Sequence, residues 1–349
     1  MTEDGGDGES GASGAPHPDD DGSGREEFAH DPLGGVSVRG GMTVGDLVDA
    51  YGEAGIGAAD LHDAAGLTAE MFGDDDVTVL LGLAGAMVPT GMRPLVADLV
   101  RDGYVDALVT TGANLTHDGI EAIGGRHHHG RAAGEGSLRD HDERLREEGV
   151  DRIYNVYLPQ EHFELFESHL RERVFPAVER TVSIREFVTE LGRANLERNR
   201  EADVDADPGV AAAAYEADVP VYVPAIQDSV LGIQAWMYSQ VSEFALDALG
   251  DMTELSDLAF DAERAGALLV GGGVPKNYVL QTMLTVPDAY DHAVQLTTDP
   301  EHTGGLSGAT LSEARSWGKL EPDAEHATVV GDATITLPLL IAAARERVE

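Results

Sequence analysis

The chain contains no cysteine and almost no lysine. The absence of cysteine excludes disulfides, thiolate nucleophiles and cysteine-ligated zinc. Of the 23 Lys+Arg residues only Lys276 and Lys319 are lysines, and they face 64 Asp+Glu. The net charge of −41 excludes a nucleic-acid-binding protein, and the self-repulsion that it causes is relieved by salt. We therefore predict a salt-adapted protein, with a merely acidic protein as the alternative.

Long apolar runs are also missing. No segment approaches the ~20 apolar residues of a membrane span, and the N-terminus has neither the basic nor the apolar region of a signal peptide. We expect a cytoplasmic protein that has no membrane partner. Hydrophobic residues nevertheless make up 42% of the 349 residues, which is enough for a sizeable core in one large domain or two.

The first 35 residues differ in composition from the rest of the chain. They are rich in Gly, Asp, Glu, Ser and Pro and have few apolar groups, so they cannot bury enough surface to offset the entropy lost on ordering. We predict a disordered acidic tail over 1–35 and a folded domain over 36–349.

From Val77 onward the sequence repeats a buried strand, a turn of small residues and a helix. The predicted strands are 77–81, 107–110, 152–157, 219–225, 267–270, 290–296 and 328–330. Helices are predicted at 43–51, as a pair within 55–71, at 161–173 and at 183–197, with exposed segments at 134–148 and 201–207. This order predicts an α/β fold: a Rossmann-like, doubly wound, mostly parallel sheet with helices on both faces.

The two lysines occur in unusual surroundings. Lys276 follows three glycines that end an apolar run, and a turn without side chains lets a phosphate or a dinucleotide approach the backbone. Lys319 is close in sequence to Glu313 and Trp317, and an amine shielded by an indole loses its proton more readily than a free one. Arginine cannot replace a nucleophilic amine. We predict a chemical role for lysine here, with two ordinary surface cations as the alternative.

Two further motifs have two interpretations each. The run His127–His129 suggests zinc, but three consecutive imidazoles cannot all face one ion on a regular element, so we expect a polar loop and no metal. Asp228 follows a predicted strand, where a carboxylate can accept hydrogen bonds from a ribose. Together with Ser229 it can equally cap the next helix.

Six motifs in one order carry a family resemblance. They are LVTTGANLTHDGIEAIGG, RIYNVYLPQEHFELFE, PVYVPAIQDSVLG, GGGVPKNY, SGATLSEARSWGKL and VVGDATITLPLL. After about Gly40 the chain resembles deoxyhypusine synthase, particularly its archaeal branch and a haloarchaeal type of member.

The resemblance implies a reaction and its partners. It implies an NAD-dependent aminobutyltransferase that moves the 4-aminobutyl group of spermidine to one lysine of archaeal translation initiation factor 5A, the first step of hypusine biosynthesis. NAD takes a hydride from the donor, an enzyme lysine holds the resulting fragment as an imine, and the retained hydride reduces the final product. The family also implies a homotetramer with active sites at dimer interfaces.

The resemblance assigns roles to residues of this sequence. Lys319 matches the nucleophile, and Glu313, Trp317, His117 and Asn277 match positions that bind the donor. The positions that match contacts to NAD are Thr111, Gly112, Asp228, Thr298, Asp299, Asp332 and Ala333.

Four positions depart from the family pattern. Ile233 and Leu306 stand where spermidine-using members have acidic residues, Asn277 replaces a histidine and His117 replaces a glutamate. A spermidine cation would lose several close anions there, so agmatine is an alternative donor. Two other functions stay open: aminobutyl transfer between small amines, as in homospermidine synthases, and an NAD-binding relative without catalysis. The presence of Lys319 argues against an NAD-binding relative without catalysis.

Overall fold

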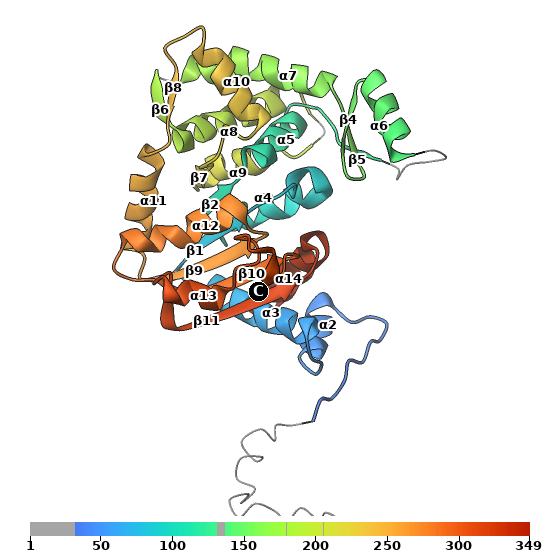
Figure 1. Cartoon of the computed structure of the whole chain (residues 1–349), viewed down its shortest axis with the longest axis vertical. Helices are drawn as coiled ribbons and strands as arrows, with labels where there is room; N and C mark the ends of the chain where they lie inside the picture. Colours follow the sequence, from blue (N-terminus) through green and yellow to red (C-terminus); the bar gives the residue numbers. More distant parts are fainter. Residues whose placement is uncertain (1–31, 131–136, 179, 205) are drawn as a thin grey trace, which may run out of the picture.

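A six-stranded parallel sheet forms the centre of the molecule (Figure 1). The computed structural model describes residues 32–130, 137–178, 180–204 and 206–349. The strands lie in the order β11-β10-β9-β1-β2-β7, and every pairing between them is parallel. Their bounds are β1 Val77–Leu83, β2 Ala107–Thr110, β7 Val221–Tyr222, β9 Arg264–Val270, β10 Tyr290–Thr297 and β11 Leu320–Val330. The predicted α/β class is confirmed.

Both faces of this sheet carry helices, because alternate side chains of each strand point to opposite faces. In β9, Leu268 and Val270 join one core cluster, whereas Ala267 and Leu269 join the other. The first cluster is covered by α2 (Val44–Tyr51), α3 (Gly57–Gly73) and α14 (Ala333–Val348). The second is covered by α11 (Gly250–Asp261), α12 (Gly273–Thr282) and α13 (Leu311–Ser316).

Further helices lie around the β2-β7 edge of the sheet and beyond it, from the middle to the top of Figure 1. They are α4 Arg93–Arg101, α5 Gly112–Ala122, α7 Glu161–His169, α8 Ile184–Glu201, α9 Val210–Ala217 and α10 Val230–Ser239. Two small sheets accompany them: β3 His128–His129 with β5 Val156–Pro159 and β4 Val150–Ile153, and β6 Thr181–Ser183 with β8 Ala245–Asp247. Short single-turn helices lie at Val88–Met92, Leu170–Val174, Phe175–Ala177, Met283–Thr285 and Glu301–Thr303.

Several predicted boundaries were wrong. The predicted strand 152–157 is an antiparallel hairpin of β4 and β5, in which Tyr154 has a φ of 52° at the turn. The predicted pair of helices within 55–71 is the single helix α3. The last strand begins at Leu320 rather than at 328, because its first half alternates exposed and buried residues with no continuous apolar run.

The predictions of exposed segments at 134–148 and 201–207 were only partly correct. Within 134–148, the residues after 136 form the helix α6 (Leu138–Glu147), which begins at the capping residue Ser137. The 201–207 segment is not simply exposed, because Asp207 binds both Arg101 and Arg93. The predicted tail lies outside the described residues apart from its last four. Among the described helices, none has the length and apolar character needed to cross a membrane.

The order of the strands defines a switch point in the sheet. From β1 the sheet extends through β2 to β7 on one side and through β9 and β10 to β11 on the other. Ligands of open α/β sheets bind at the carboxyl ends of the strands beside such a point. Here the carboxyl ends of β1 and β9 flank it.

Candidate functional site

Both lysines of the chain line a single pocket between α12 and α13. The pocket has a volume of about 270 Å³, and its other walls include Asn277, Leu306 and Trp317. Lys276 and Asn277 belong to α12, Trp317 follows α13, and Leu306 belongs to the segment that leads from β10 into α13. A chain that otherwise uses arginine thus places its only two amines within one cavity.

Lys319 is half-buried and directs its amine toward α12. Its Nζ donates a hydrogen bond to Oδ1 of Asn277 at 3.3 Å and lies 5.9 Å from the centre of the Trp317 ring. Burial lowers the pKa of Lys319, while the negative charge of Glu313 opposes this shift. A lowered pKa increases the fraction of neutral, nucleophilic amine.

Lys276 is more deeply buried and holds a pocket wall in place. It is 4% exposed, and its Nζ donates to the carbonyl oxygens of Leu306 and Ala309 at 3.0 and 2.5 Å. Burial lowers the pKa of Lys276 to about 8, against the opposing charge of Glu313 and with the help of the Lys319 charge. Because both backbone oxygens belong to the segment that follows β10, Lys276 ties this segment to α12.

Glu313 and Trp317 complete the pocket from α13. The helix begins at Thr310, whose hydroxyl accepts a hydrogen bond from the backbone N–H of Glu313. Glu313 and Trp317 are both exposed, the indole to 63%. An exposed carboxylate and an exposed indole face beside two amines can hold an organic cation.

The predicted cofactor positions form a second group at the carboxyl ends of the strands. Thr111 and Gly112 follow β2, and a Cβ added to Gly112 would overlap the side chain of Ser229. Asp228 precedes α10, but Ser229 caps this helix, so the exposed Asp228 carboxylate is not the cap. The remaining positions follow β10 (Thr298, Asp299) and β11 (Asp332, Ala333).

The turns at the switch point can accommodate a ligand that approaches the backbone. Gly85 follows β1 and Gly273 follows β9; they have φ values of 69° and 60°, and a Cβ at either would meet no atom within 4 Å. The predicted contacts include neither glycine, although the glycine run before Lys276 pointed to this turn. Open, side-chain-free turns at a sheet switch point fit a dinucleotide.

The structure brings only part of the predicted site together. Asn277, Glu313, Trp317 and Lys319 line the pocket, whereas none of the strand-end positions does. The backbone of Lys319 lies at the amino-terminal end of β11. The residues that follow this strand lie at its other, carboxyl-terminal end. His117 also lies away from the pocket, on α5.

His117 is paired with a residue that the sequence assigned to a polar loop. Its Nδ1 lies 2.9 Å from Nε2 of His127, and Nδ1 of His127 lies 2.6 Å from Glu121. The His127 side chain is only 6% exposed, whereas His128 and His129 are exposed on β3. The histidine run therefore divides into one buried and two exposed residues.

Within the described residues, one group of three side chains has the spacing of metal ligands. It consists of Glu70, His292 and Glu325, whose ligand atoms lie within 4.8 Å of one another. Arg264 donates a hydrogen bond to Nε2 of His292 at 2.6 Å. Because arginine cannot accept, Nε2 holds the lone pair and Nδ1 carries the proton. The imidazole then has no lone pair left for a metal.

The fold is an α/β fold whose pocket contains a half-buried amine, and two of its turns at the carboxyl ends of the strands have room for a ligand beside the backbone. Residues 46–344 match the family model described as deoxyhypusine synthase. A protein of Methanosarcina mazei named “Probable deoxyhypusine synthase 1” is 47% identical over 90% of this chain and 95% of its own length. The Methanothermobacter thermautotrophicus protein named “Probable deoxyhypusine synthase” is 41% identical over 88% and 96%.

A solved structure has the same fold. The crystal structure of a candidate deoxyhypusine synthase from Entamoeba histolytica matches with a TM-score of 0.61 and 16% identity, over 88% of this chain and 95% of that one. The chain belongs to the deoxyhypusine synthase family. The enzymes of this family are aminobutyltransferases that use NAD.

Proposed function

We propose that this chain transfers the 4-aminobutyl group of spermidine, or an agmatine-derived equivalent, to a lysine of archaeal translation initiation factor 5A. The catalytic unit is the single domain over 36–349, and Lys319 is its covalent nucleophile. The observation that carries the proposal is the pocket that contains both lysines of the chain, in which the Lys319 amine is half-buried beside Asn277 and Trp317. A translation factor as acceptor places the reaction in the cytoplasm.

The residues of the pocket suit the steps of this transfer. When bound, NAD would accept the hydride that leaves the donor and would return it to the imine formed on the acceptor lysine, so that the transferred group ends as a saturated amine. Lys319 then attacks the oxidised carbon, the small amine leaves, and the butyl fragment stays on Nζ as an imine. The lysine of the factor displaces Lys319 from this carbon, and Trp317 limits the access of water. Glu313 binds the terminal ammonium of the fragment.

The charges that line the pocket affect which donor can bind. Glu313 contributes a carboxylate, whereas Leu306 is apolar and Asn277 is neutral. A donor whose far end carries a guanidinium tolerates this lining better than the compact ammonium groups of spermidine, because a guanidinium is more weakly hydrated. This argument supports agmatine as the alternative donor.

We further propose that the complete site combines two copies of the chain within a homotetramer. The pocket contains none of the strand-end positions, and it is bordered by exposed apolar side chains: Leu284 is 50%, Leu306 49% and Trp317 63% exposed. A second copy that covers these groups would bury apolar surface and supply the missing residues. The acidic composition supports a salt-adapted, haloarchaeal-type member.

The decisive experiment is a mass measurement of the acceptor protein. Enzyme, factor and NAD are incubated with spermidine or with agmatine, and the factor is weighed. We expect a gain of one aminobutyl or one guanidinobutyl group with one of the two amines. A gain with neither amine contradicts the proposal, and a new polyamine formed without the factor indicates transfer between small amines instead.

The role of Lys319 is tested in the same assay. Lys319→Arg keeps the charge but removes the nucleophile, so transfer should fall by roughly three orders of magnitude or more while NAD binding persists. Borohydride should trap the donor fragment on Lys319 of the wild type. Ser316→Ala, an exposed change on the same helix, is the control and should transfer normally. Transfer by Lys319→Arg at the wild-type rate removes the assignment.

A further inference from the structure

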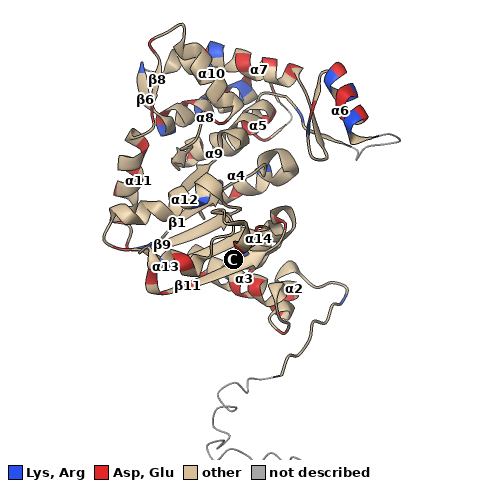
Figure 2. Ribbon diagram, in the orientation of Figure 1, with Lys and Arg blue, Asp and Glu red and all other residues tan. Residues whose placement is uncertain are grey.

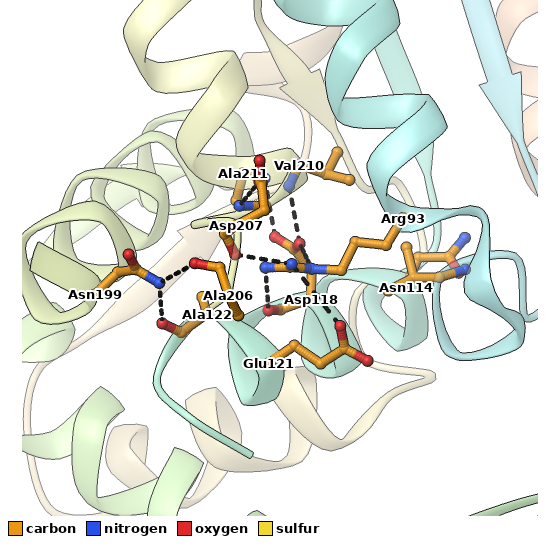
Figure 3. Close-up of polar contacts among 12 residues, drawn as sticks. Arg93, Asn114, Asp118, Glu121, Ala122, Asn199, Ala206, Asp207, Val210 and Ala211 are labelled. Atoms are coloured by element: carbon orange, nitrogen blue, oxygen red, sulfur yellow. Dashed lines mark hydrogen bonds and ion pairs between the residues drawn. The ribbon is translucent and has the colours of Figure 1, made fainter. Parts of the chain in front are cut away.

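Four polar side chains form a continuous chain from the interior to His117. Arg93 is buried and donates to Asp118 through Nε at 2.7 Å; its Nη1 lies 3.8 Å from Oε2 of Glu121 (Figure 3). The other carboxylate oxygen of Glu121 bonds to Nδ1 of His127, whose Nε2 bonds to Nδ1 of His117. Arg93, Glu121 and His127 thus each have a partner on both sides, and His117 ends the chain.

The direction of these hydrogen bonds follows from the ionised Glu121. Burial opposes ionisation, but the hydrogen bond from His127 and the charge of Arg93 hold the pKa of Glu121 below its usual value. A carboxylate only accepts, so Nδ1 of His127 must donate. When His127 is neutral, its lone pair is on Nε2, and Nδ1 of His117 donates to it.

This polarity fixes the free nitrogen of His117. With its proton on Nδ1, the neutral imidazole has a lone pair on Nε2. Burial lowers the pKa of His117 to about 4, helped by the charge that His127 carries when it is protonated and opposed by Glu121, so the His117 ring is neutral at pH 7. His117 therefore presents an acceptor where a glutamate in the same place would present an anion.

We propose that His117 accepts the proton of the donor amine at Nε2 and that His127 and Glu121 are positioning residues that carry the positive charge away from it. The inference rests on the proposed function, in which a second copy of the chain supplies the residues that the pocket of Lys319 lacks, His117 among them. It adds a proton path that the pocket of Lys319 does not contain.

The path balances as a two-step proton relay. The donor ammonium transfers a proton to Nε2 of His117, and the donor nitrogen keeps the electron pair of that N–H bond. The lone pair of the neutral amine then allows the adjacent carbon to release a hydride. His117 passes its Nδ1 proton to Nε2 of His127. The resulting imidazolium lies 2.6 Å from the Glu121 carboxylate, a more favourable place for a cation than the buried His117.

Other charged groups surround this path. Arg93 and Arg126 both act on Glu121, while His162 senses the charges of His127 and His128. The titration therefore belongs to the group of residues as a whole and is measured as an apparent pKa.

Ring-nitrogen NMR tests the arrangement without any assay of activity. The full chain is labelled with ¹⁵N-histidine, and the His117 and His127 signals are assigned by their loss in His117→Asn and His127→Phe. At pH 7.5 we expect His117 to carry its proton on Nδ1 and to have an unprotonated Nε2. A proton on Nε2 of His117 at this pH overturns the inference.

A pH profile of transfer tests the relay itself. Glu121→Gln keeps the shape but removes the anion, so the conjugate acid loses stability and the acid limb of kcat/KM should move to lower pH by roughly one unit. The plateau should fall roughly tenfold because the base is weaker. His129→Gln, an exposed change two residues from His127, should match the wild type.

The outcomes separate this inference from the proposed function. If the wild type transfers from an amine and Glu121→Gln leaves the acid limb in place, the relay is wrong and the function stands. A merely structural role of Glu121 lowers the rate without moving the limb. If the wild type transfers from neither amine, the proposed function fails, and with it the donor as proton source. Circular dichroism of each variant checks that it is folded.

Discussion

At the residue scale, Lys276 shows how burial controls a charge. Two carbonyl oxygens accept from its Nζ, but among the described residues no carboxylate forms an ion pair with it. Carbonyls offset part of the lost hydration, and burial lowers the pKa to about 8. The residue thus fastens the wall of the pocket, and although a pKa of about 8 leaves it mostly protonated at pH 7, it loses its proton more readily than an exposed lysine.

This pKa makes stability depend on pH in a defined direction. The unfolded chain binds a proton at Lys276 up to roughly pH 10.4, whereas the folded chain loses it near 8. Between these values the unfolded state holds more protons, so the free energy of unfolding rises with pH. The rise should be on the order of 2 kcal/mol from pH 8 to 10 relative to Lys276→Met.

Urea unfolding of both proteins across this range measures the effect. Lys276→Met also loses the two hydrogen bonds of the lysine, but this loss is the same at each pH. It therefore cancels when the pH dependence of the unfolding free energy is compared between the variant and the wild type. Arg139→Met removes an exposed cation on α6 and should run parallel to the wild type. Parallel curves for Lys276→Met and the wild type would contradict a lowered pKa.

At the element scale, Asp118 joins three segments of the chain. Its carboxylate, 0% exposed, accepts from Arg93 and from the backbone N–H groups of Val210 and Ala211 at the start of α9 (Figure 3). The first turn of a helix has N–H groups without partners, and a buried carboxylate satisfies them while it neutralises the arginine. The node fixes α5 against α9 and places the segment that leads to Glu121.

Loss of this carboxylate should be costly. Asp118→Asn leaves the buried guanidinium with only the more distant carboxylate of Glu121, so the free energy of unfolding should fall by roughly 3 to 5 kcal/mol. Asp98→Asn is the matched control, because Asp98 pairs with Arg101 on the surface and should contribute less than about 1 kcal/mol. Urea midpoints of the two variants decide, and equal small losses would show that the node does not stabilise the fold.

At the scale of the whole molecule, one part of the proposed site lies at the amino-terminal end of β11 and the other at the carboxyl ends of the strands. This division predicts that two inactive variants restore activity when their subunits mix. Lys319→Arg removes the amine, and Asp332→Ser removes a strand-end carboxylate but keeps a residue that caps α14. Each variant alone should be inactive. Coexpressed, they should regain roughly a quarter of the wild-type activity, since half of the pairs are mixed and one of their two sites is intact.

Activity of the mixture measures this directly. A mixture that stays as inactive as its components would place the whole site within one chain. Light scattering of the same samples reports whether the subunits associate, so that failed mixing is recognised.

The charge of the molecule predicts a requirement for salt. Acidic side chains are distributed over the outer helices, among them α3, α7 and α13, and on α6 they alternate with arginines (Figure 2). At a net charge of −41, repulsion in dilute buffer opposes the compact state and salt screens it. The thermal midpoint should rise steeply between 0.1 and about 2 M KCl, followed by circular dichroism. Full stability in dilute buffer would identify a merely acidic protein.

The sequence alone located the strands of the central sheet, though not where the last of them begins, and the two lysines that mark the pocket. Apolar runs such as 77–81 and 107–110 predict their own burial, because hydrophobic pattern and small-residue turns act within one segment. A scarce residue type is visible without any structure, so Lys276 and Lys319 stood out at once.

Only the tertiary structure decided which of these residues meet. Asn277 accepts a hydrogen bond from Lys319, which is 42 positions away in the sequence. The side chain of His127 contacts Glu121 and His117, whereas the two histidines that follow it are exposed. The tertiary structure also separated the pocket from the strand ends, since the strand β11 runs from Leu320 to Val330 and puts Lys319 and Asp332 at its opposite ends. Such contacts depend on how helices pack across a sheet, and local propensity contains no information about partners that are distant in the chain.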